Sequence, residues 1–113
     1  MNYGELKAKI IDQSHRKDMA GRVAGFVDDA RIRINMRLGL SLAPLAADTD
    51  TDVILTENDL MYFYLALQSL YEFISEFETA SYYQGKWEGQ ADHYYLTRAG
   101  TTPLVITPEN PAP

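Results

Sequence analysis

LMYFYLALQSLYEFISEF, residues 60–77, is the segment that decides the fold of this chain. Its large apolar side chains recur every three or four residues, the spacing that lines up side chains along one side of a helix. The stripe comprises Leu60, Tyr64, Leu67, Tyr71 and Ile74, and Phe63, Leu70 and Phe77 widen it to an arc of roughly 200°. A surface helix needs an apolar arc of only about 100°. This helix is therefore expected to require more than one neighbour.

Few positions in this helix are expected to face solvent. They are Leu65, Ser69, Glu72 and Glu76. Thr56 and Asp59 have the spacing of a capping box, in which each end residue bonds the backbone of the other. The helix is therefore predicted to begin here.

Two further helices are predicted before this segment. Asn2 and Glu5 form another capping-box pattern, and the helix that follows should run to about Ser14. The polar stretch SHRKD breaks this helix, and Asp18 can cap the next one, which should end near Gly39. The expected core positions are Tyr3, Leu6 and Ile10 in the first helix, and Val23, Val27, Ala30, Ile34 and Leu38 in the second.

The region after about Thr79 carries another apolar face. It comprises Ala80, Tyr83, Trp87, Ala91 and Tyr94, with Gly85 and Gly89 on the opposite side. The spacing fits either a new helix or a continuation after a kink. A glycine in a helix interior costs about 1 kcal/mol relative to alanine. Either the close approach of another chain offsets this cost or the helix frays locally, and we favour the close approach.

Residues 41–55 lack helical periodicity and are predicted to form a loop, with DTDTD as an exposed acidic tip. DTDTD has neither the glycine nor the distal glutamate of a calcium-binding loop, so no calcium site is expected.

The stretch ARIRINMRL, residues 30–38, is the strongest candidate for a protein interface. On a helix, Ile32 and Met36 form an apolar pair that points away from the core stripe. Arg33 and Arg37 form a second pair at the edge of that stripe, and Arg31 lies on the other flank. Single exposed apolar residues are normal on protein surfaces. An aliphatic residue and a methionine beside arginine are nevertheless typical of interfaces.

Charge is distributed unevenly along the 113 residues. Residues 1–40 hold eight Lys and Arg against five Asp and Glu, a balance of +3, whereas residues 41–113 hold two against eleven, a balance of −9. The sum, −6, disfavours nucleic-acid binding by clustered cations. The asymmetry fits either a dipolar subunit that attracts its neighbour or ordinary solvated helix surfaces.

Composition and motifs argue against several other classes of protein. The length suits one domain, there is no cysteine, and no signal-peptide or membrane-spanning segment is evident, so we expect a soluble, unprocessed chain. His15 and His93 lie in polar surroundings without a metal-binding or catalytic motif. We therefore predict no catalytic residues, no metal, no cofactor and no enzymatic activity.

The last part of the chain is predicted to differ from the rest. Residues 1–100 should form the helical domain, with Gly100 ending its last helix, and residues 101–113 should form an extended arm because four prolines exclude a further helix. Leu104, Val105 and Ile106 form an apolar cluster within the arm. Such a cluster suits docking along a neighbouring protein, although a frayed tail without a partner is the alternative.

Several of these elements together resemble the head-to-tail adaptor, or connector, proteins of tailed bacteriophages. That family shows a short Y-x-x-L-K helix, an H-R-x-D turn and an F-x-x-x-A-x-x-R-I-N helix. The matching residues here are Tyr3, Leu6, Lys7, His15, Arg16, Asp18, Phe26, Ala30, Arg33, Ile34 and Asn35. A long aromatic-rich helix and a helix like SYYQGKWEGQADHYYLTR follow, so the resemblance covers roughly the first 98 residues. The family often carries a longer, strand-containing insertion where this chain has only SLAPLAADTDTDVIL.

The resemblance implies an all-α fold, a small helical bundle dominated by the long aromatic-rich helix. It also implies a ring, usually of twelve copies, that binds the portal protein, extends the DNA channel and offers a platform for tail or nozzle proteins. DNA would pass through the ring without specific binding, and the protein would lie at the head-to-tail interface of the virion after assembly from the host cytoplasm. The candidate interface residues are Ile32, Arg33, Met36, Arg37, Gly85, Gly89, Leu104, Val105 and Ile106. The alternative is a small acidic regulatory or antitoxin-like binding module, although no helix-turn-helix or heptad pattern is present.

Overall fold

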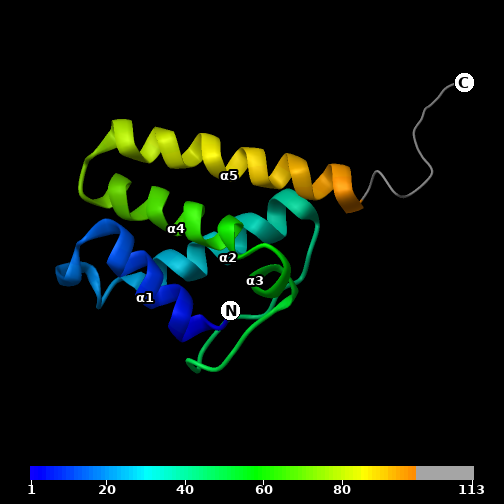
Figure 1. The fold of residues 1–113 in the computed structure, drawn as a ribbon, viewed down its shortest axis with the longest axis horizontal. Coiled ribbons are helices and arrows are strands. Elements are labelled where there is room, and N and C mark those ends of the chain that lie inside the picture. Colours follow the sequence, from blue (N-terminus) through cyan, green and yellow to red (C-terminus); the bar gives the residue numbers. More distant parts are fainter. Residues whose placement is uncertain (99–113) are drawn as a thin grey trace, which may run out of the picture.

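The computed structural model describes residues 1–98, with side-chain surroundings given as far as Tyr94. Within these residues the chain forms five α-helices and one short 3-10 helix, with no strand (Figure 1). In chain order they are α1 (Tyr3–Ser14), η1 (Lys17–Met19), α2 (Val23–Leu38), α3 (Val53–Glu57), α4 (Asp59–Phe73) and α5 (Phe77–Arg98). The predicted all-helical class is confirmed. The predicted arm, residues 101–113, lies outside the described residues.

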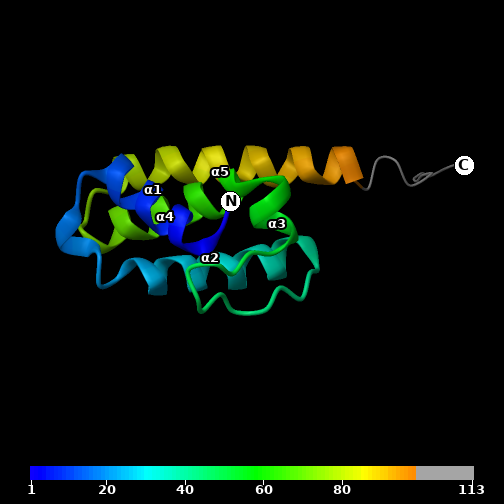
Figure 2. The same ribbon diagram turned by 60° about the horizontal axis from the view of Figure 1, so that its bottom comes forward.

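The central element of the bundle is α4, which contacts the four other α-helices. Figures 1 and 2 show α2 and α5 on different sides of it. Between Met61 and Leu70 its side chains are buried almost all the way round, so the prediction of several neighbours is confirmed. The prediction that Leu65 faces solvent is wrong, because its side chain is completely buried (0% exposed). Packing on several sides leaves α4 little solvent-facing surface.

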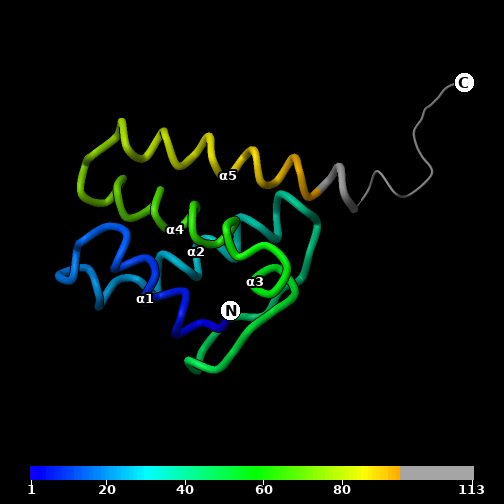
Figure 3. Tube along the Cα trace, viewed as in Figure 1, coloured from blue at the N-terminus to red at the C-terminus, as the bar shows by residue number. Residues whose placement is uncertain are grey.

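The predicted continuous helix over residues 60–77 is wrong at its C-terminal end. α4 ends at Phe73, and the chain reverses through Ser75, whose φ of 61° is left-handed, before α5 begins at Phe77 (Figure 3). Because of this reversal, Phe77 is 63% exposed instead of extending the apolar stripe. The region after Thr79 therefore belongs to a separate helix.

The reversal gives the apolar face of α5 a partner. Ala80, Tyr83, Trp87 and Ala91 are buried, as the sequence predicts, and Tyr94 is half-buried. Tyr83 stacks on two tyrosines of α4, at ring-centroid distances of 6.0 Å from Tyr64 and 5.7 Å from Tyr71. A helix continuing straight from α4 would leave this face in water, which explains why the chain turns back.

The first helix, α1, matches its prediction. Asn2 Oδ1 accepts a hydrogen bond from the Glu5 amide, and Glu5 Oε1 accepts one from the Asn2 amide, each at 2.9 Å. The helix ends after Ser14, where His15 adopts a left-handed φ of 55°. Tyr3, Leu6 and Ile10 are buried as expected.

The second helix, α2, has the predicted core stripe but not the predicted cap. Val23, Val27, Ala30 and Ile34 are buried, and Gly39 ends the helix with a φ of 66°. Asp18 lies within η1, and no side chain caps the start of α2 at Arg22. The Asp18 carboxylate instead accepts hydrogen bonds from the Arg16 guanidinium at 2.9 and 2.7 Å. Asp18 therefore pairs with the nearby Arg16 and does not cap α2.

The segment between α2 and α4 is more ordered than the sequence suggests. Residues 53–57 form α3, and Asp52 caps it by accepting a hydrogen bond from the Leu55 amide at 2.8 Å. The predicted capping pair of Thr56 and Asp59 is wrong, because Thr56 lies within α3 and Asn58 precedes α4 without a side-chain cap. Asp52 therefore caps α3, and α4 begins directly after α3 without a side-chain cap of its own.

The DTDTD segment is not simply an exposed tip. The carbonyls of Asp50 and Asp48 accept hydrogen bonds from the amides of Tyr3 and Gly4, at 2.8 and 2.9 Å. The first amides of a helix have no partner within the helix. This loop therefore satisfies two of them in α1 and joins two segments that are almost 50 residues apart.

Candidate protein interaction surfaces

The outer face of α2 carries the apolar pair predicted from the sequence. Ile32 is 43% exposed and Met36 is 80% exposed, while Ile34 between them is buried. The pair points away from the core because Val27, Ala30 and Ile34 occupy the opposite side of the helix. We call Ile32 and Met36 the α2 pair. Its exposure agrees with the sequence, and its role as an interface stays a prediction.

The arginines beside this pair are largely engaged within the chain. Arg37 donates a hydrogen bond to Asp92 at 2.8 Å and so links α2 to α5. Arg31 bonds Asp28 and the carbonyl of Leu42, both at 3.0 Å. Arg33 is half-buried. The arginines therefore do not form one basic stripe, and Arg37 contributes to an exposed ion pair of the kind that is worth less than about 1 kcal/mol.

The outer face of α5 holds Gly85 and Gly89, both exposed. A Cβ atom added at either position would meet no atom within 4 Å. Nothing within the described part of the chain therefore approaches these glycines closely enough to require them. The close approach of another chain stays a prediction.

The structure separates the predicted interface residues into two surfaces. The buried faces of α2 and α5 both pack on α4, while α2 and α5 contact each other only slightly. Figures 1 and 2 show α2 and α5 on different sides of the bundle, so the α2 pair and the two glycines face different directions. Leu104, Val105 and Ile106 lie outside the described residues.

An aromatic surface that the sequence analysis missed lies where α4 turns into α5. Phe73 is 50% exposed and Phe77 is 63% exposed. Phe73 packs on Phe26 of α2 at a ring-centroid distance of 6.0 Å, and the Arg22 guanidinium lies 4.5 Å from its ring. The sequence pattern predicts both phenylalanines within one continuous helix. Glu72, Glu76 and Glu78 flank them in the sequence EFISEFE, and such a cluster of acidic residues indicates an exposed turn.

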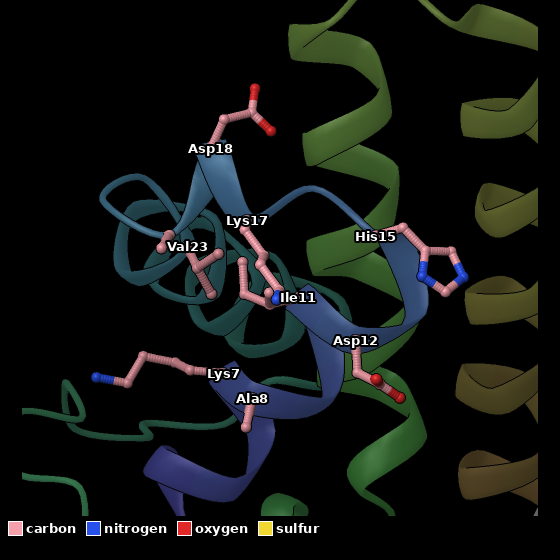
Figure 4. A pocket seen from close by; sticks show the side chains of 9 residues that line it. Lys7, Ala8, Ile11, Asp12, His15, Lys17, Asp18 and Val23 are labelled. Atoms are coloured by element: carbon pink, nitrogen blue, oxygen red, sulfur yellow. The ribbon is translucent and has the colours of Figure 1, made fainter.

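A groove between α1 and the segment that leads into α2 was also not anticipated (Figure 4). Its volume is about 820 Å³, and it is lined by Lys7, Ala8, Ile11, Asp12, His15, Lys17, Asp18, Ala20 and Val23. In Figure 4, Lys17 extends from η1 toward Ile11, whereas Asp12 and His15 project on the other side of α1. We call this the α1 groove. It combines residues from three successive segments, so no local pattern could show it.

Hydrogen bonds and burial shift the pKa values of Asp18, Asp50 and Tyr62. Hydrogen bonds from Arg16 lower the pKa of Asp18. Two backbone amides, of Ala46 and Ala47, bond the Asp50 carboxylate at 2.8 and 2.9 Å and lower its pKa. Burial, followed by the hydrogen bond to Asp52, raises the pKa of Tyr62. Each of these groups has a structural partner, and Asp18, which lines the α1 groove, is paired with Arg16.

Among residues 1–98, no group of three His, Asp or Glu side chains is placed to hold a metal ion. His15 and His93 are both exposed and lie on different elements: His15 follows the end of α1, and His93 lies within α5. No described helix is long and apolar enough to cross a membrane. The candidate interaction surfaces on the described residues are the α2 pair, the glycine face of α5, the aromatic turn and the α1 groove.

No family model, curated protein or solved structure matches this chain. The resemblance to phage adaptors therefore depends on the sequence elements described above.

Proposed function

We propose that this chain is a structural virion protein, a head-to-tail adaptor of a tailed bacteriophage. In this role its copies form a ring beneath the portal, extend the DNA channel and provide a docking platform for tail or nozzle components. The subunit would be a helical bundle organised around its aromatic-rich helix, with residues 101–113 as an arm. The resemblance implies twelve copies in the ring.

One observation carries the proposal. The α2 pair and the exposed glycines of α5 are two different candidate interfaces on different sides of one small subunit. A closed ring joins unlike surfaces of successive copies, because each subunit meets one neighbour with one surface and the next with another. A symmetric dimer would need only one such surface.

The charge distribution supports the same arrangement. The first 40 residues have a balance of +3 and the remainder a balance of −9. Unlike charges on successive subunits favour association, and they fix its direction. The acidic total also suits a channel in which DNA slides without sticking, because like charges repel the phosphates.

Replacing the α2 pair tests this function. We expect Ile32→Asp with Met36→Lys to leave helix content unchanged and to shift the free energy of unfolding by less than about 0.5 kcal/mol, because both side chains are exposed. Ring formation on the portal protein from the same genome should fail. Circular dichroism measures the first outcome and negative-stain electron microscopy the second.

A matched control introduces the same charges elsewhere. Ala43→Asp with Ala46→Lys changes two exposed residues in the loop after α2 and should leave ring formation intact. Rings formed normally by the α2-pair variant would contradict the proposal. Loss of helix in that variant would show instead that the pair supports the fold of the subunit.

A further inference from the structure

The α1 groove combines an apolar strip, formed by Ala8, Ile11, Ala20 and Val23, with ionisable side chains, which are Lys7, Asp12, His15, Lys17 and Asp18. Ile11 is half-buried along its wall, Val23 is buried at its base, and Ala8 and Ala20 are exposed beside them. Small residues at positions 8 and 20 leave room that larger side chains would fill. The volume of about 820 Å³ lies within the range of roughly 300–1,000 Å³ that is usual for ligand sites. Lys17 is exposed at the rim.

The chain itself contains a segment that fits such a site. Leu104, Val105 and Ile106 are the only consecutive apolar residues in 101–113, apart from prolines, and Glu109 is the only charged side chain there. In an extended segment, alternate side chains point the same way, so Leu104 and Ile106 can enter one groove together. Glu109 follows Ile106 by three residues, roughly 10 Å of extended chain.

In its own subunit, this segment begins at the end of the bundle remote from η1 and the end of α1. In Figures 1 and 2, η1 and the end of α1, which supply lining residues of the groove, lie at the same end of the bundle as the start of α5, whereas α5 ends at Arg98 at the other end. The 22 residues of α5 span about 33 Å. Leu104 and Ile106 follow Arg98 by six and eight residues, at most roughly 22 and 29 Å of extended chain. The route must also pass around α4, which stands between α5 and α1.

We infer that the α1 groove is a docking site for residues 104–106 of a neighbouring copy of this chain. The inference rests on the proposed function, since it assigns the partner of one surface within the ring. An arm that leaves one end of a subunit and a groove at the other end are what a head-to-tail linkage requires. Leu104 and Ile106 occupy the space beside Ala8 and Ile11, and Glu109 lies near Lys17.

Peptide binding tests the groove without requiring a ring. The protein is the full chain with Leu104→Asp and Ile106→Asp, so that its own arm does not compete, and the probe is a fluorescent peptide of residues 101–113. We expect saturable binding by fluorescence anisotropy. Ala8→Glu should weaken it at least about tenfold, equivalent to about 1.4 kcal/mol, because the added carboxylate enters the groove. Ala43→Glu, the same exposed substitution outside the groove, should bind the peptide normally.

A cross-linking experiment identifies the source of the arm. The chain has no cysteine, so single cysteines can be introduced without background. We expect Ala8→Cys in one chain and Thr107→Cys in a second chain of different size to form a disulfide-linked heterodimer under mild oxidation. Ala43→Cys with Thr107→Cys should form much less.

The outcomes separate this inference from the proposed function. No saturable peptide binding, or binding that Ala8→Glu leaves unchanged, would overturn the inference. If rings still form on the portal in that case, and the α2-pair variant still abolishes them, the adaptor proposal stands without the groove. Binding that Ala8→Glu removes would support the groove even if no ring forms, and the missing ring would then count against the adaptor.

Discussion

At the scale of single residues, Gly4 allows the loop that contains Asp48 and Asp50 to lie against α1, because it has no side chain. A Cβ atom at this position would lie 2.9 Å from Cβ of Asp48 and 3.3 Å from its carbonyl oxygen. The same carbonyl accepts the Gly4 amide hydrogen bond. Neither atom is the free end of a flexible side chain, so a larger residue must displace the loop.

We therefore expect Gly4→Ala to lower the free energy of unfolding, by up to about 2 kcal/mol. Overpacking costs about 1–3 kcal/mol, and the helix preference of alanine offsets about 1 kcal/mol of this. Gly25→Ala is the matched control, since a Cβ there meets nothing within 4 Å, and it should gain about 1 kcal/mol. Thermal unfolding compares the two, and equal shifts would contradict the steric role of Gly4.

Asp50 makes the same loop sensitive to acid. Bonds from the Ala46 and Ala47 amides lower its pKa in the folded chain. Its stabilising effect is therefore complete above the pKa of the unfolded chain, about 3.9, and is lost as the pH falls through the lower folded value. We expect the hydrogen-exchange protection of the Tyr3 and Gly4 amides, which the loop bonds, to decrease below about pH 4.

Asp50→Asn provides the control for this effect. It should reduce the protection of both amides at neutral pH and remove most of the change below pH 4. Protection that follows the same pH profile in Asp50→Asn and in the unaltered chain would assign the effect to another carboxylate.

At the scale of whole elements, one face of α5 is tightly packed, whereas its outer face carries Gly85 and Gly89. No contact among the described residues requires glycine at these two positions. We expect Gly85→Ala with Gly89→Ala to stabilise the free subunit by about 1 kcal/mol per site, because alanine favours helix and nothing lies within 4 Å. The same change should weaken ring assembly if a neighbour packs against this face. Calorimetry and electron microscopy measure the two effects.

The opposite signs of these effects make the test specific. Gly25→Ala, on the same outer face of α2 as Ile32 and Met36, should give a similar gain in stability, and it measures the effect of alanine on helix stability alone. If the α5 variant is more stable and forms rings as well as before, its glycine face is not an interface.

At the scale of the whole molecule, the uneven charge should appear in the kinetics of assembly. Raising the ionic strength from about 0.1 M to about 1 M shortens the screening length from about 10 Å to about 3 Å. We expect ring assembly on the portal to slow markedly, while the thermal unfolding of the subunit changes little, because most of its ion pairs lie at the surface. Light scattering follows the rate, and a rate independent of salt would exclude steering by charge.

The sequence by itself determined the features that depend on neighbouring residues. The faces of α1, α2 and α5 follow from a repeat of 3.6 residues, and the capping box of Asn2 and Glu5 spans one turn. The exposure of Ile32 and Met36 follows from the same periodicity, since Ile34 and Ala30 occupy the buried side. These predictions hold because the interactions that produce them are local.

The tertiary structure decided what depends on distant contacts. Leu65 is buried because α4 is packed on several sides, and α4 ends at Phe73 because the apolar face of α5 must be buried. The loop of residues 40–52 is held by the first amides of α1, and the α1 groove exists only where α1 meets the segment before α2. Helix periodicity specifies which side of an element is apolar, but it contains no information on how many partners cover that side or where they come from.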